Sequence, residues 1–539
     1  MNQDSGQPTS GFDGDAAARA AAEALAAQRP IPQASFRGAL ARRLSALDPG
    51  FGPRPANLWP RVLGLVALGS VLLLFGVARA VAQSSQQHPS VTRGAGLTVG
   101  FSGAPELTDG STGGTQTQWA ERAHSVSTQI VRITAYWSSI APTQPPTAAD
   151  ARSPNWTGYQ WASLDQQVEQ LTDDGFRVMI TVNYAPRWAE GAHPAYNAYA
   201  GTWEPSATDF GEFATAITTR YDGYTVPLDA GATNAFLPQV TLWQPWNEPN
   251  LNLEISPQWN ANNTPASPGI YRNLLNAFYT AAKAVSSSNY VVAAGTAPFG
   301  DPPPSYRMSP VTFDQYLFCL NPKDRKVGCS NPPHFDAIDH HPYGIGGPEA
   351  HAPNTADATV PDIYKLVRVL DVAERDHTVL PAGKKAVWVT EIAWNTSPGD
   401  VPIATQARWL EQALYVLWHQ GVSTVLWYRL ADEPIEPNQA ISTYSGVYYI
   451  GGSAKPSATA FRFPFLTNRR NKTTVVAWGR APQAGQLKIE QQAKHGWTVL
   501  TQFTVTKLEV FQLALRLKGH ATLRAVLGNN TSLTWSQDA

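Results

Sequence analysis

Two glutamates in this chain stand in similar surroundings. Glu248 lies in LWQPWNEPNL (residues 242–251), and Glu391 lies in AVWVTEIAWNT (residues 386–396). Each ends an apolar run typical of a buried strand. Two carboxyl groups that flank a glycosidic bond can cleave it, because one protonates the leaving oxygen while the other attacks the anomeric carbon or activates water. The strands that carry the two glutamates must therefore bring them together.

Short β-rich runs alternate with helical patterns along the middle of the chain. The runs cover residues 97–102, 129–137, 177–184, 239–247, 291–296, 335–343, 386–394 and 422–430. Between them lie helical patterns, such as Trp161, Leu164, Val168 and Leu171 before Gly175. This alternation predicts an α/β fold with a parallel sheet, and eight such units favour a (β/α)8 TIM barrel. A doubly wound open sheet is the alternative, but no Gly-rich phosphate turn follows any run.

The barrel would place the two glutamates in one mouth. Active sites of (β/α)8 barrels lie at the carboxyl ends of the strands, where Glu248 ends the fourth run and Glu391 the seventh. An acid in such a pair needs a raised pKa, and burial against Trp243 and Trp246 would contribute to it. The two carboxyl groups can therefore meet at one bond, and a retaining enzyme would hold them about 5 Å apart.

The second carboxylate must stay ionised, so it needs donors beside it. Arg132 in the second run and Tyr343 after the sixth are candidates to hold Glu391. His341, close to Tyr343, is a further candidate for the site, and a histidine satisfied within the core is the alternative.

These motifs resemble those of the clan of retaining (β/α)8 glycoside hydrolases, which includes families 5 and 39. WNEPN and TEIAW are similar to its acid/base and nucleophile motifs, and the likeness extends to VRI, HPYG, VLWYRL and residues 446–464. The resemblance implies that Glu248 is the acid/base and Glu391 the nucleophile. It further implies that Asn247 bonds the sugar hydroxyl next to the anomeric carbon and that Trp427 is a stacking platform. It implies no metal and no organic cofactor, because the carboxyl groups supply the chemistry.

The amino-terminal region divides into three parts. Residues 1–57, rich in Ala, Gly, Pro and Ser, predict a disordered cytoplasmic tail. Residues 58–82 contain an uncharged apolar run that is long enough for a single transmembrane signal-anchor helix, and residues 83–96 form a polar linker. The excess of arginine before the apolar run predicts that the remainder lies outside the cytoplasm, at the cell membrane. Cleavage of a signal peptide after the small-x-small sequence at 80–82, which would give a secreted protein, is the alternative.

Two domains are predicted after the linker. Residues 97–464 form the catalytic barrel domain, and residues 465–539 contain short alternating runs that predict a small antiparallel β-sandwich. Two roles are open for the sandwich: glycan binding through Trp478 or Trp497, or support of the barrel.

Composition bounds the possible partners. The chain has 539 residues and a net charge of −1, which gives no indication of a nucleic-acid partner. Its two cysteines, Cys319 and Cys329, bracket a polar loop and are expected to form a disulfide outside the cytosol. No further Cys or close His pair completes a zinc site.

The sequence thus predicts a membrane-anchored retaining glycosidase that cleaves O-glycosidic bonds of an extracellular polysaccharide or oligosaccharide. A catalytically silent barrel that only binds glycan at the cell surface is the alternative from the class of binding proteins, and a structural envelope protein is a third.

Overall fold

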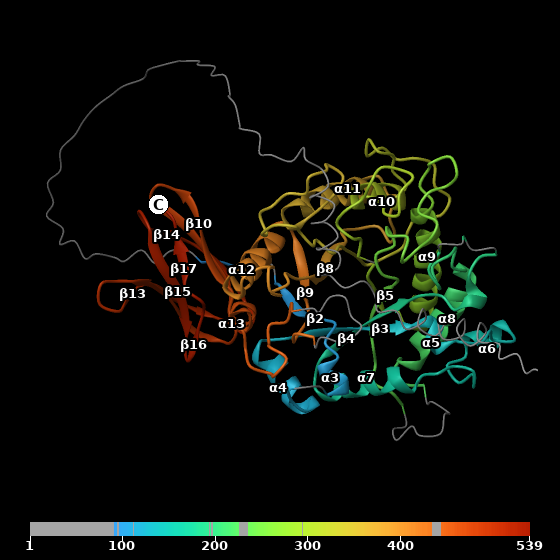
Figure 1. The fold of residues 1–539 in the computed structure, drawn as a ribbon, viewed down its shortest axis with the longest axis horizontal. Coiled ribbons are helices and arrows are strands. Elements are labelled where there is room, and N and C mark those ends of the chain that lie inside the picture. Colours follow the sequence, from blue (N-terminus) through green and yellow to red (C-terminus); the bar gives the residue numbers. More distant parts are fainter. Residues whose placement is uncertain are drawn as a thin grey trace, which may run out of the picture.

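Eight parallel strands form the central sheet of the protein (Figure 1). The computed structural model describes residues 91–93, 96–110, 113–192, 195, 198–225, 236–293, 295–433 and 444–539. The central strands are β2 (Thr98–Ser102), β3 (Ile130–Tyr136), β4 (Arg177–Asn183), β5 (Leu242–Pro245), β6 (Tyr290–Val291), β7 (Ala337–Asp339), β8 (Ala386–Ile392) and β9 (Val422–Tyr428). Each lies within one of the predicted runs or within a residue of it.

The sheet curves into a nearly closed barrel. Hydrogen bonds join the strands in the order β6-β5-β4-β3-β2-β9-β8-β7. Parallel bridges from Val292 to Ala337 and from Thr296 to His340 connect the two ends of this order. The predicted parallel (β/α)8 architecture is confirmed.

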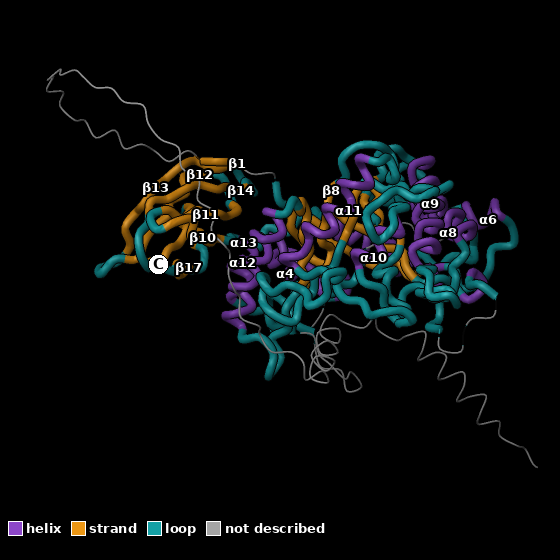
Figure 2. Tube along the Cα trace, turned by 90° about the horizontal axis from the view of Figure 1, so that it is seen from above, coloured by secondary structure: helices purple, strands orange, loops and turns teal. Residues whose placement is uncertain are grey.

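Helices surround the strands (Figure 2). They are α3 (Glu106–Asp109), α4 (Gln116–Ser125), α5 (Trp137–Ile140), α6 (Ala148–Arg152), α7 (Ala162–Asp173), α8 (Ala207–Arg220), α9 (Ser267–Val285), α10 (Pro310–Leu317), α11 (Ile363–Arg375), α12 (Ile403–His419) and α13 (Pro456–Arg462), with short 3-10 turns at Arg187–Ala189 and Val360–Asp362. In α7, the apolar positions read from the sequence (Leu164, Val168 and Leu171) are buried. This helix ends just before Gly175, which has a φ of 81°, a conformation that glycine adopts without steric cost.

The barrel interior is layered, because alternate residues of a strand point to the same face. A lower apolar layer is formed by Ile130, Met179, Leu242, Val292, Ala337, Trp388 and Leu426. Gly100 of β2 lies beside this layer, where a Cβ would stand only 1.9 Å from the carbonyl oxygen of Ile130. Two residues further along the strands, the inward side chains are polar: Ser102, Arg132, Thr181, Gln244, Asp339 and Thr390. This polar layer is the floor of the barrel mouth.

Antiparallel sheets follow the barrel at the carboxyl end of the chain. One has the order β1-β14-β11-β10, and the other has the order β13-β12-β15-β16, with β17 paired to β15. Their bounds are β1 (Val91–Arg93), β10 (Phe465–Asn471), β11 (Thr474–Arg480), β12 (Gly485–Gln492), β13 (Trp497–Val505), β14 (Val510–Arg516), β15 (Ala521–Leu527), β16 (Asn530–Thr531) and β17 (Trp535–Gln537). The antiparallel pattern read from the sequence is confirmed, whereas β1 comes from the segment read as a linker and lies among the carboxyl-terminal strands (Figure 2).

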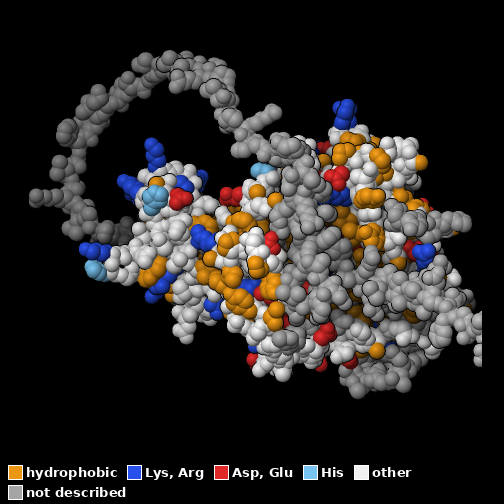
Figure 3. Space-filling model, viewed as in Figure 1, with side chains coloured by type: hydrophobic (Ala, Val, Ile, Leu, Met, Phe, Trp, Pro, Cys, Tyr) orange, Lys and Arg blue, Asp and Glu red, His pale blue; other side chains and the backbone are white. Residues whose placement is uncertain are grey.

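Buried side chains join these sheets to the barrel. The ring of Trp478 lies 5.5 Å from that of Tyr415 and 5.8 Å from that of Trp418, both in α12. Arg480 is buried, and its Nε donates to the carbonyl oxygen of Leu97 at 3.0 Å. Trp478 is fully buried in the interface with the barrel, so of the two roles left open by the sequence it takes support of the barrel and not glycan binding. On the face in Figure 3, Lys and Arg lie mainly over the carboxyl-terminal sheets, and Asp and Glu mainly over the barrel.

The structure pairs Cys319 and Cys329 in a disulfide after α10. Among the residues that the structure describes, no helix is long and apolar enough to span a membrane. The predicted tail (1–57) and apolar segment (58–82) lie outside the described residues. They therefore remain predictions.

Candidate active site

Glu248 lies in a tight turn directly after β5. Trp246 and Glu248 have φ values of 74° and 35°, a region that residues other than glycine seldom occupy. Two backbone hydrogen bonds hold the turn: Glu248 N–H donates to Gly295 O at 3.0 Å, and Leu251 N–H donates to Glu248 O at 2.9 Å. Strained backbone of this kind persists only where its surroundings fix it, and it is frequent at functional sites. The turn directs Glu248, which is fully buried, toward the barrel interior.

Glu391 lies near the end of β8 and faces Glu248. One carboxylate oxygen of each residue and one ring nitrogen of His341 all lie within 4.8 Å of one another. Glu391 is 8% exposed. Carboxyl groups of retaining glycosidases are about 5–5.5 Å apart, whereas those of inverting enzymes stand about 6.5–9.5 Å apart. The nearest carboxylate oxygens of Glu248 and Glu391 lie within 4.8 Å, so both carboxyl groups can reach one bond.

Arg132 of β3 forms a buried ion pair with Glu391. Its Nη1 donates to Glu391 Oε1 at 2.6 Å, and this ion pair is almost completely buried. Its other acceptors lie at 2.7–3.0 Å and are the side chains of Ser102, Thr181, Gln244 and Asn247. A guanidinium with all three nitrogens bonded is fixed in orientation. Arg132 therefore fixes the carboxylate of Glu391 and stabilises its ionised form.

His341 lies between the two glutamates. Its Nδ1 is 2.9 Å from Glu248 Oε1 and 4.0 Å from Glu391 Oε2. Its Nε2 is 3.1 Å from Thr390 Oγ1 and 3.3 Å from Asp339 Oδ2. Burial lowers the pKa of His341, but the surrounding carboxylates Glu391, Asp339 and Glu248 outweigh it and raise this pKa to about 9. The ring therefore carries a proton at neutral pH.

Tyr343 and Trp427 complete the set of residues expected from the sequence. The hydroxyl of Tyr343 donates to Glu391 Oε2 at 3.1 Å. Trp427 is 1% exposed, its Nε1 donates to the carbonyl oxygen of Ser445, and its ring lies 6.0 Å from that of Trp394. A sugar can stack only on an exposed ring face, and the ring of Trp427 is covered in the structure. Its role as a stacking platform remains a prediction.

Asn247 is held at both ends of its amide. Its Oδ1 accepts from Arg132 at 2.9 Å, and its Nδ2 donates to Glu254 Oε1 at 3.1 Å. The other oxygen of Glu254 accepts from Asn183 Nδ2 at 2.9 Å. Glu254, which is fully buried, therefore positions the amides of Asn247 and Asn183.

The aromatic residues at the mouth differ from those expected. Trp243 packs against Phe278 of α9, and Trp246 packs against Phe210 of α8. Both rings thus belong to the layer between the barrel and its helices, and the residue bonded to Glu248 is His341.

Two tyrosines instead stand at adjacent strand ends. Tyr136, the last residue of β3, is 39% exposed, and its ring stacks at 6.2 Å on that of Tyr184, which directly follows β4. Burial of its hydroxyl, with contributions from Tyr428 and Glu254, raises the pKa of Tyr136 to about 12. The phenol of Tyr136 is therefore protonated at neutral pH and close enough to the carboxylates of the site to be affected by their charge.

Glu248, His341 and Glu391 are also close enough to provide three metal ligands. Two observations oppose this use. Arg132 already occupies one oxygen of Glu391, and the raised pKa of His341 means that its ring is protonated rather than ready to ligate. The donor set fits a hydrogen-bonded carboxylate pair better than a metal centre.

The structure thus brings Glu248, Glu391, Arg132, Asn247, His341 and Tyr343 together. The sequence reading missed Ser102, Gln244, Glu254, Asp339 and Thr390. Except for Glu254, each of these lies two residues after an apolar or glycine position of the lower layer, and this spacing marks inward residues of a strand.

Comparison with known proteins gives fold similarity only at low sequence identity. The sequence matches no model of a known protein family and no curated protein. A family 39 glycoside hydrolase from the gut symbiont Bacteroides cellulosilyticus WH2 is similar with a TM-score of 0.48 and 17% identity, over 78% of this chain and 81% of that one. A glucosidase from Croceicoccus marinus has a TM-score of 0.46 and 13% identity, over 80% and 97% of the two chains. A GH5-4 broad-specificity endoglucanase from Clostridium acetobutylicum has a TM-score of 0.40 and 15% identity, over 68% and 96%.

Proposed function

We propose that this protein is a retaining glycosidase that cleaves O-glycosidic bonds of a polysaccharide or oligosaccharide by double displacement. The close approach of the Glu248 and Glu391 carboxylates, within 4.8 Å, is the observation that carries the proposal. Both lie at the carboxyl ends of barrel strands, where (β/α)8 enzymes have their active sites.

Glu391 is the nucleophile in this proposal. Its carboxylate accepts from Arg132 and from Tyr343, so it is held ionised and oriented. It attacks the anomeric carbon while Glu248, protonated, gives its proton to the leaving oxygen. The ring of His341, 2.9 Å from Glu248 Oε1 through its Nδ1, orients that carboxyl group.

The second step reverses the proton transfer. Glu248, now a carboxylate, takes a proton from water, which attacks the glycosyl-enzyme and releases Glu391. Asn247, fixed between Arg132 and Glu254, is positioned to bond the sugar hydroxyl next to the anomeric carbon. The stacked rings of Tyr136 and Tyr184 offer a flat surface for a neighbouring sugar.

Variants of the two glutamates test the assignment on a panel of aryl glycosides and polysaccharides. Glu391→Gln should abolish turnover while the fold and glycan binding remain. Glu411→Gln is a matched control, because Glu411 is a buried glutamate in α12 whose pKa burial raises well above the usual value. Its replacement by a neutral amide should leave activity intact. Full activity of Glu391→Gln would remove the nucleophile assignment.

The roles of the two residues are separated by azide. Glu248→Ala should lose activity on polysaccharide but keep the first step on a glycoside with an acidic phenol, since such a leaving group needs little protonation. The glycosyl-enzyme then accumulates as a burst, and azide should restore turnover with retained configuration. Azide rescue of Glu391→Ala with an inverted product would exchange the roles. Glycan binding without turnover by the wild type would instead favour the silent binding barrel.

The placement of the protein is a separate proposal, drawn from the sequence. Residues 58–82 anchor it in the cell membrane, with the catalytic domain (97–464) and the accessory domain (465–539) outside the cytoplasm. Protease added to intact cells should release a fragment that begins after about residue 83 and leave the arginine-rich tail protected. A soluble mature protein beginning at Gln83 would show that the segment is a cleaved signal.

A further inference from the structure

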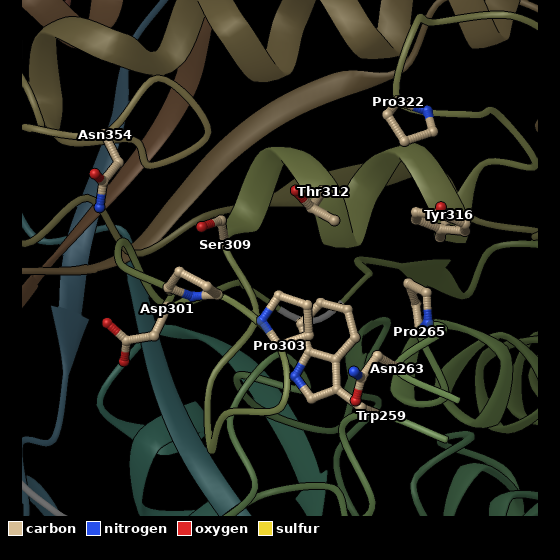
Figure 4. A pocket seen from close by; sticks show the side chains of 12 residues that line it. Trp259, Asn263, Pro265, Asp301, Pro303, Ser309, Thr312, Tyr316, Pro322 and Asn354 are labelled. Atoms are coloured by element: carbon tan, nitrogen blue, oxygen red, sulfur yellow. The ribbon is translucent and has the colours of Figure 1, made fainter. Parts of the chain in front are cut away.

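A cleft lies on the loops at the carboxyl side of the barrel (Figure 4). Its volume is about 420 Å³, within the roughly 300–1,000 Å³ of ligand sites. Its walls come from the loop after β5, from the segment after β6 together with α10, and from the loop after β7. The lining residues that matter here are Trp259, Asn263, Asp301, Thr312, Tyr316 and Asn354. None of the residues assigned above to the carboxylate site is among those that line it.

The loops of the cleft are joined to the turn of Glu248. Leu251 and Arg307 form an antiparallel bridge, and Asn252 N–H donates to the carbonyl oxygen of Tyr306 at 2.7 Å. The loop after β5 and the segment after β6 are therefore paired close to Glu248. A ligand in the cleft would be held on the same two segments that shape the acid/base turn.

Two aromatic side chains stand on opposite walls of the cleft. Thr312 and Tyr316 are one turn apart on α10, so they lie on the same helix face. Figure 4 shows both on the cleft side of α10, with Trp259 across from them. Both aromatic side chains are half-buried and line the cleft, so part of each ring is accessible from it. Flat rings held in this way can stack on the apolar face of a sugar.

The polar groups of the cleft favour an uncharged ligand. Asp301 is the one charged residue among the lining residues that the structure describes, and Arg307 pairs with it. Amides and hydroxyls supply the other polar contacts. Asn354 is held in place, because its Nδ2 donates at 3.0 Å to the buried carboxyl group of Asp357. An anionic glycan would meet the carboxylate of Asp301, and no described lining residue of the cleft supplies a positive charge to bind it.

We propose that this cleft binds a segment of neutral glycan, as a second binding site that holds the substrate chain away from the bond being cleaved. The proposal rests on the proposed glycosidase function. It predicts that the cleft affects polymeric substrates and leaves small aryl glycosides unaffected, because the latter reach only the carboxylate site.

Binding is measured by affinity gel electrophoresis of the full chain in gels that contain neutral polysaccharides, with Glu391→Gln as the non-hydrolysing parent. Adding Trp259→Ala and Tyr316→Ala should weaken retardation by about fivefold to tenfold, as expected for the loss of stacked rings. Trp259→Phe, which keeps a flat ring, should restore most of the binding. Tyr224→Ala removes an exposed tyrosine beyond the end of α8, away from the cleft, and is the matched control. Thermal melting verifies that all variants are folded.

Activity assays with an intact Glu391 separate the two proposals. Trp259→Ala/Tyr316→Ala should raise KM for the polymer and leave kcat/KM for an aryl glycoside unchanged. Equal retardation of the parent and the cleft variant by every polysaccharide that binds would overturn the cleft site while leaving the glycosidase proposal intact. Absence of retardation by all neutral polysaccharides would also overturn it, and hydrolysis of aryl glycosides by the wild type would then show that the catalytic proposal survives.

Discussion

Replacement of Arg132 by methionine tests the electrostatic arrangement of the site. The guanidinium and the carboxylate of Glu391 are 2.6 Å apart, with side-chain exposures of only 4% and 10%. Removing the guanidinium takes away the closest charge partner of the buried Glu391, and loss of one partner of a buried ion pair costs about 3–5 kcal/mol. We therefore expect Arg132→Met to lower the free energy of unfolding by about this amount at pH 7. Arg132→Lys should recover only part of it, because an ammonium cannot reproduce the fork of the guanidinium.

A double-mutant cycle isolates the pair. In Arg132→Met/Glu391→Gln the uncompensated charge is gone, so urea denaturation should give a coupling energy of about 1.5–3 kcal/mol between the two positions. Additivity of the two single changes, or a loss below about 1 kcal/mol for Arg132→Met, would refute the claim that this ion pair holds an ionised Glu391.

Two further predictions follow from the neighbours of the glutamates. The pKa of His341 is raised from 6.5 to about 9, so its stabilising contribution is complete below pH 6.5 and is lost as the pH rises through 9. The wild type should therefore lose about 3 kcal/mol of stability between pH 6.5 and 9.5 that His341→Gln does not lose; parallel pH profiles of the two proteins would contradict this. Glu254→Gln places an amide donor against the amide of Asn247 or Asn183. It should lower kcat about tenfold with little change in KM, since the sugar contact of Asn247 strengthens in the transition state. An effect on KM alone would show that Glu254 acts only in substrate binding.

The barrel was predictable from the sequence because each strand has its own local signal. Runs such as RVMITVNY at 177–184 are apolar and β-branched, and they are separated by helical patterns that end at glycines such as Gly175 and Gly421. Because Glu248 ends the fourth run and Glu391 the seventh, the order of the strands alone predicted that both lie in the mouth of the barrel. Strand β6 (Tyr290–Val291) is only two residues long and shares only Val291 with the run predicted at 291–296.

Other features depend on tertiary contacts that local patterns do not encode. Strand β1 (Val91–Arg93) pairs with β14, more than four hundred residues away in sequence, and the polar run at the end of β10 (Phe465–Asn471) hid that strand. Trp243 and Trp246 were expected beside Glu248. Trp243 is adjacent to the inward-facing Gln244 in β5, and adjacent residues of a strand point to opposite faces, so its ring faces the helices. Trp246 follows β5, where its positive φ turns the chain. Glu254 lies in an irregular loop, so no periodicity marked it as a partner of Asn247.

The anomeric configuration of the first product tests the central claim most directly. The wild type is mixed with a glycoside that it cleaves, and proton NMR spectra are recorded before mutarotation equalises the anomers. Attack by Glu391 followed by attack of water inverts the anomeric carbon twice, so the sugar released first should have the configuration of the substrate. Release of the opposite anomer would show that water attacks directly, and it would contradict the assignment of Glu391 as the nucleophile.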